Sequence, residues 1–235
     1  MGQPVVVHAL EGQPFGFGQG VEDIADDPGA TSAALTSALN GSAFGFDFNP
    51  TIDRIRNVSD ANQNLVLNPN DGSSTRVTDL FYAAGDPNEG ADPNVVHSAY
   101  TNSFAGATST QLFGIDVGLD TLVTQANSAG TLETVGTIGL DVLSTGGFDI
   151  SGTTGTAFLA VEGTGLDAGF TMFWEIDLAT GLGSSSTGSP LVSNQVGGGE
   201  LLTAIAVVPE PGTATALLAA VGLFGLRRRA THPRG

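Results

Sequence analysis

The chain has 235 residues, 34 of them glycine, and only 13% of the residues are charged, which suits one domain with appendages. Residues 1–208 carry a formal charge of −20, because 23 acidic residues face three arginines and no lysine there. Phosphate backbones repel such an acidic body, which excludes a nucleic-acid-binding function. The absence of cysteine excludes disulfides, thiol catalysis and thiolate metal sites.

The first segment, residues 1–29, gives no well-defined element. The apolar run at residues 5–7 is too short for the core of a signal peptide, and no basic residue precedes it. We therefore expect an export signal and further repeat material upstream of this sequence, with residues 1–29 as a remnant of that material.

Short strands are expected from residue 44 onward. Apolar and β-branched runs alternate there with Gly, Pro, Asn and Asp, which favours an all-β fold rich in turns. In chain order, the expected strands are 44–48, 54–58, 64–67, 113–117, 121–125, 132–135, 147–150, 157–161, 173–177 and 201–208.

A Gly-x-Asp opening recurs three times. Aligned on Gly45, Gly114 and Gly147, the openings are 69 and 33 residues apart, roughly two units and one unit. Units of 30–45 residues with several short strands are typical of β-propellers. We predict β-propeller-like repeats of short antiparallel strands, in a complete or an incomplete ring; a β-sandwich whose strands share composition is the alternative.

The three openings place Asp47, Asp116 and Asp149 in equivalent positions. Such carboxylates could line a central channel of a repeat fold. More commonly an aspartate in this setting bonds to backbone amides and fixes the geometry of the repeat. We favour the structural role.

One loop carries the weak signal for a metal. Calcium prefers six to eight oxygen ligands on a flexible loop, and residues 86–94 could supply some of them. The candidate ligands are Asp86, Asn88, Glu89 and Asp92. The loop lacks the EF-hand pattern and holds two prolines, so an ordinary acidic turn is the alternative. No other cofactor is indicated, and no catalytic constellation of side chains emerges, so we expect a non-enzymatic protein.

The C-terminal residues 209–235 form a separate tail. Pro209, Glu210 and Pro211 end the body, and an uncharged run follows at 213–226. As a helix this run is about 21 Å long, short of a hydrocarbon core of about 30 Å, but insertable with thinning of the bilayer. The expected membrane-anchoring residues are Leu217, Leu218, Val221, Leu223, Phe224 and Leu226, and the basic cluster that stays cytoplasmic is Arg227, Arg228 and Arg229.

This motif, helix and basic cluster, in that order at the very end, resemble the PEP-CTERM sorting signal of Gram-negative bacteria. The resemblance implies recognition by an exosortase, a membrane-embedded cysteine protease that cuts near the motif. It also implies export, a transient anchor in the inner membrane, and a final place at the cell surface or outside. Proteins with this signal are linked with exopolysaccharide and biofilm, which makes exopolysaccharide or other envelope components the expected partners.

The amino-acid sequence of the body is also distinctive in four segments. The segments 42–60, 64–69, 82–88 and 99–104 together resemble the uncharacterised bacterial domain family DUF4394 over residues 30–208. The family has no established activity, so the resemblance supplies no catalytic residues. We expect a surface or matrix protein with a binding or structural role. The alternative is a secreted polysaccharide-acting enzyme with acidic residues in a propeller cleft.

Overall fold

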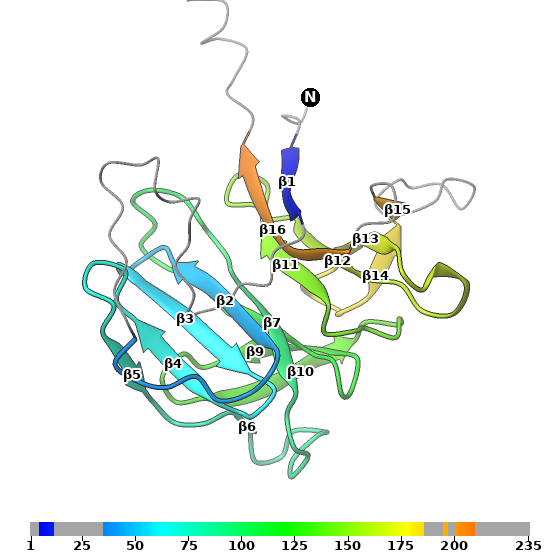
Figure 1. The fold of residues 1–235 in the computed structure, drawn as a ribbon. Coiled ribbons are helices and arrows are strands. Elements are labelled where there is room, and N and C mark those ends of the chain that lie inside the picture. The colour runs from blue at the N-terminus through cyan, green and yellow to red at the C-terminus, as the bar shows by residue number, and fades with distance from the viewer. Residues whose placement is uncertain (1–4, 12–34, 186–194, 197–200, 210–235) are drawn as a thin grey trace, which may run out of the picture.

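The computed structural model describes residues 5–11, 35–185, 195–196 and 201–209 (Figure 1). Their regular secondary structure is almost entirely strand, joined by turns and loops, with one short 3-10 turn at Gly165–Asp167. The predicted all-β class is therefore confirmed. No helix among the described residues is long and apolar enough to cross a membrane, and the predicted helix at 213–226 lies outside them.

The described strands form four sheets. The first sheet is the meander β2 (Phe44–Asn49), β3 (Arg54–Ser59), β4 (Asn64–Leu67) and β5 (Ser74–Arg76). The second is β7 (Val95–Tyr100), β8 (Leu112–Asp116), β9 (Thr121–Gln125) and β10 (Thr131–Thr137), with β6 (Phe81–Tyr82) parallel to β10. The third is β11 (Gly146–Ile150), β12 (Ala157–Glu162), β13 (Thr171–Ile176) and β14 (Gly183–Ser185), with β15 (Gln195–Val196) on β13. The fourth pairs β1 (Val5–Glu11) with β16 (Leu202–Pro209), from opposite ends of the described chain.

One edge strand of each sheet, β2, β7, β11 or β16, lies next to the neighbouring sheet, and these four are the leading strands. The leading strands of successive sheets are neighbours in space. Strand β2 lies beside β7, β7 beside β11, and β11 beside β16 (Figure 1). These strands begin at Phe44, Val95, Gly146 and Leu202, which are 51, 51 and 56 residues apart. The repeat is thus longer than the predicted 30–45 residues.

The predicted alignment of the three openings is also wrong at its middle member. Residues 113–117 fall mainly in β8, which is the second strand of its sheet, whereas 44–48 and 147–150 lie in leading strands. The leading strand β7 carries no Gly-x-Asp sequence. The alignment therefore combined two different positions of the repeat.

Apolar side chains fill the first two interfaces between neighbouring sheets. Between the first and second sheets they are Val58, Leu80, Tyr82, Val95, Val123 and Leu132. Between the second and third they include Ala99, Phe113, Ile115, Leu122, Phe148, Ile150, Leu159 and Ile176. Burial of this apolar surface holds the sheets face to face.

Two glycines allow the leading strands to approach closely. A Cβ atom on Gly45 would lie 2.9 Å from the backbone of Val96 in β7. A Cβ atom on Gly147 would lie 2.6 Å from the amide nitrogen of Ile205 in β16. Real Cβ atoms do not tolerate such distances to a backbone, so these two Gly-x-Asp openings serve strand packing.

Candidate functional site

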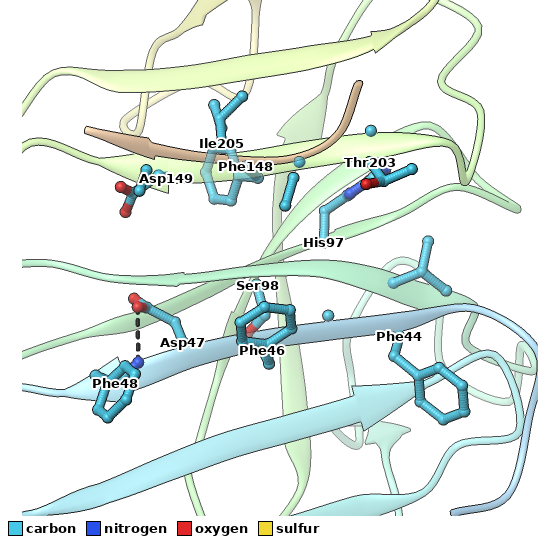
Figure 2. Close-up of a pocket in the computed structure, with 16 residues that line it drawn as sticks. Phe44, Phe46, Asp47, Phe48, His97, Ser98, Phe148, Asp149, Thr203 and Ile205 are labelled. Atoms are coloured by element: carbon cyan, nitrogen blue, oxygen red, sulfur yellow. Dashed lines mark hydrogen bonds between the residues drawn. The ribbon is translucent and has the colours of Figure 1, made fainter. Parts of the chain in front are cut away.

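A cavity of about 210 Å³ lies where the four leading strands converge. Each strand contributes four or five consecutive residues to its wall, except β7, which contributes three. Its side chains are mostly apolar, and Phe46, Phe148 and Ile205 are among the residues that line it (Figure 2). Ligand sites are usually apolar cavities with a few polar groups, and this cavity is smaller than the roughly 300–1,000 Å³ that is typical of them.

Asp47 lies at one end of this cavity and is fixed by backbone amides. One carboxylate oxygen accepts a hydrogen bond from the amide of Phe48, at 2.7 Å. The other accepts one from the amide of Tyr100, on the neighbouring strand β7, at 2.6 Å. The carboxylate thus joins β2 to β7.

Asp149 repeats this arrangement two sheets further along. Its oxygens accept hydrogen bonds from the amide of Ile150, at 2.7 Å, and from the amide of Val207 in β16, at 2.5 Å. The favoured structural role, backbone bonding by the aspartates of the openings, therefore matches the geometry at both positions. Figure 2 shows that the two carboxylates lie on facing strands at the same end of the cavity.

Asp116 does not belong to this pair. It lies at the end of β8, where it accepts a hydrogen bond of 2.7 Å from the hydroxyl of Tyr82 and two more from the amides of Gly118 and Leu119. The expectation that all three aspartates are equivalent is wrong for this residue, because β8 is a second strand.

Burial changes the proton affinity of the paired carboxylates. It raises the pKa of Asp47 to about 7, against the opposing hydrogen bond from Tyr100, and the nearby charge of Asp149 raises it further. Burial also raises the pKa of Asp149, which the amides of Val207 and Ile150 partly offset. Near neutral pH, Asp47 can therefore either donate or accept a hydrogen bond.

A second, open cavity of about 390 Å³ adjoins the pair. Asp47, Phe48 and Asp149 line both cavities, so the carboxylates lie where the two meet. Phe104, in the loop after β7, lines the open cavity as well. Phe48 and Phe104 are 54% and 51% exposed. Asp47, Phe48, Phe104 and Asp149 form the mouth of the site, which therefore combines two acidic groups with two accessible aromatic side chains.

Two buried polar side chains of β7 line the inner cavity. His97 is 3.0 Å from the carbonyl oxygen of Leu143 through its Nε2 atom, and burial lowers its pKa. Ser98 is buried, and its hydroxyl makes no hydrogen bond. An unsatisfied buried hydroxyl costs stability and is available to a ligand or water.

The calcium candidates lie away from this site. The carboxylate of Asp86 accepts hydrogen bonds from the amide and hydroxyl of Thr134 in β10, and these bonds lower its pKa although burial acts to raise it. Glu89 accepts a bond from the amide of Gly85, and Asp92 accepts one from Asn62.

Asn88 donates to the hydroxyl of Thr134, at 3.0 Å. The described part of the chain brings no three His, Cys, Asp or Glu side chains together in a way that could hold a metal ion. Calcium binding by this loop stays a prediction.

Of the mouth residues, Asp47 and Asp149 were singled out in the sequence, whereas Phe104 was missed because its loop carries no pattern that indicates a binding site. Ser98 and His97 were missed because β7 has neither a Gly-x-Asp opening nor alternating polarity. A search for a 51-residue period would have aligned β7 with β2 and β11. Of the sorting residues, Pro209 ends β16, while the Glu210, Pro211, helix and arginine positions lie outside the described residues.

Comparison with known families supports both resemblances. The model of a domain of unknown function, DUF4394, matches residues 15–196, and the model of the PEP-CTERM protein-sorting motif matches residues 207–230. No curated protein matches the chain. The sorting motif supports an exported protein that an exosortase, a membrane protein, processes through a transiently anchored tail. The chain belongs to the DUF4394 family.

Proposed function

We propose that this protein is a non-enzymatic surface or matrix protein whose body binds a saccharide of the envelope at the Asp47–Asp149 mouth. The sorting motif places it among exported proteins. The observation that carries the proposal is the pairing of two exposed phenylalanine rings with two carboxylates around one open cavity.

The proposed fold behind this site is an open β-propeller in which the sheets are consecutive blades. Support comes from the order of the sheets, the 51-residue spacing, and the convergence of the leading strands on one cavity. Pairing of β1 with β16 adds a further, two-stranded sheet that brings the two ends of the described chain together.

The chemistry of the mouth suits a sugar ring. A pyranose presents apolar C–H faces, which pack against aromatic rings, and hydroxyl groups, which hydrogen-bond to carboxylates. Phe48 and Phe104 offer the rings, and Asp47 and Asp149 keep lone pairs beyond those that the backbone amides use. An acidic body also repels phosphate-rich polymers, which favours a neutral saccharide.

Calorimetric titration of the exported body with purified exopolysaccharide from an exosortase-bearing bacterium tests the proposal. Phe48→Ala and Phe104→Ala should each weaken binding by about tenfold, as expected for central aromatic contacts. Phe81→Ala is the matched control, because its ring is 46% exposed but lies on β6, away from the cavity. Equal losses in all three variants, or no loss in the first two, would contradict the proposal.

The second candidate is a polysaccharide hydrolase that uses the same carboxylates. The observation that favours it is the pKa of about 7 at Asp47 beside Asp149, since a general acid and a second carboxylate are the usual pair in such enzymes. Release of reducing ends from the polysaccharide, abolished in Asp47→Asn, would support this candidate over simple binding. Binding without any release of reducing ends would exclude it for that polymer.

A further inference from the structure

The sorting signal begins inside the folded body. The match to the sorting motif starts at residue 207, and β16 runs from Leu202 to Pro209. Residues 207–209 therefore belong to both the motif and the last strand of the fold.

Strand β16 is held from two sides. On one side it pairs with β1, in a register that sets Val7 opposite Val207 and Val5 opposite Pro209. On the other side the carboxylate of Asp149 in β11 accepts the hydrogen bond from the amide of Val207. Figure 1 shows β16 between β1 and β11.

A protease must bind the same backbone groups of residues 207–209 that the pairing with β1 and Asp149 occupies. Peptides commonly bind to proteins as added strands, whose main-chain N–H and C=O groups bond to the partner. The groups at residues 207–209 cannot bond to β1 or Asp149 and to a protease at the same time.

We propose that β16 is a shared element of the body and the sorting signal, so that the membrane protease can process the chain only after the end of β16 separates from β1 and Asp149. Separation is a local opening of the fold, and its population sets the processing rate when opening is fast compared with cleavage. The inference rests on the sorting role of the tail and is independent of the saccharide site, so either can fail alone.

The chain offers a matched pair of variants for the test. Asp149→Ala removes the hydrogen bond to Val207 and should speed loss of the tail several-fold. Asp120→Ala removes the same kind of bond from the amide of Val142, which lies between β10 and β11 and not in the processed strand, and should leave the rate near that of the wild type. The full chain is incubated with exosortase-bearing membranes, and the fraction that has lost its tail is followed by mass spectrometry.

Equal acceleration by both variants would mean that general loss of stability, and not release of β16, exposes the tail. No acceleration by Asp149→Ala in a folded protein would overturn the inference. Unfolding temperatures of both variants, measured beside the rates, separate these cases.

A cross-link gives a second test that does not depend on a weakened fold. His8 and Ala206 are register partners in β1 and β16, and Ala206 precedes the motif. Paired Cα atoms of antiparallel strands lie at a separation that a disulfide can span, and the chain has no cysteine of its own to interfere. The oxidised double variant His8→Cys, Ala206→Cys should keep its tail and lose it on reduction. Equal processing of the oxidised and reduced forms would refute the inference.

Discussion

Asp47 and Asp149 make the same backbone hydrogen bonds, yet each is also half-buried beside a cavity and close to a second acid. Burial raises the pKa of both, and for Asp47 to about 7 from an ordinary 3.8. The cost of burying the charged carboxylate is thus larger than the stabilisation of that charge by the amide hydrogen bonds, and the pKa rises. Such a compromise is typical of a carboxylate that serves both packing and a site.

The ionisation of Asp47 should weaken the fold as the pH rises. The folded protein binds this proton more tightly than the unfolded chain, so the stability contribution is fully present below pH 3.8 and is lost as the pH passes about 7. Asp47→Asn cannot ionise and should flatten this part of the pH dependence, measured as the free energy of unfolding by denaturant from pH 4 to pH 8. Asp177→Asn is the control that should leave the slope in this range unchanged, because hydrogen bonds from the amide of Ala179 and from Thr180 lower the pKa of Asp177 and move its titration below this range. An unchanged slope in Asp47→Asn would show that other groups cause it.

At the scale of elements, most strands could be predicted from the sequence, some to the residue. The strands at 64–67 and 121–125 begin and end where expected, because turn residues bound them tightly. Strand β7 was not predicted: all six of its residues are buried, so it lacks the alternating pattern of a half-exposed strand. With β7 missing, the true repeat of 51 residues was beyond reach, and Asp116 was wrongly grouped with Asp47 and Asp149, since both points depend on which strand leads each sheet.

The two strand-packing glycines yield a prediction about pairs of elements. Gly147→Ala would push a methyl group into the backbone of β16, and overpacking of this kind typically costs about 1–3 kcal/mol. Gly45→Ala should cost a similar amount, because it meets the backbone of β7 in the same way. Gly118→Ala is a milder control, since its Cβ would meet only side-chain atoms, at 3.3 Å or more. Denaturant unfolding measures all three, and a neutral Gly147→Ala would mean that β11 and β16 are further apart than described.

At the scale of the whole molecule, the negative charge should oppose folding. The chain has a formal charge of −17, and among its described residues the ion pair is Arg76–Asp79, at 2.7 Å on the surface. Self-repulsion is long-ranged and falls when salt shortens the Debye length, so the unfolding temperature should rise by several degrees between low and moderate sodium chloride.

Calcium chloride at equal ionic strength extends this measurement to the predicted calcium loop. Screening alone predicts similar stabilisation by the two salts. A general preference of the acidic surface for divalent ions would stabilise the wild type and Asp86→Asn equally. A specific site on the loop predicts an additional stabilisation by calcium that Asp86→Asn removes, because only a bound ion adds free energy through its own affinity for the folded state. The same extra stabilisation in wild type and variant would assign calcium to the overall field of the acidic body, and not to residues 86–92.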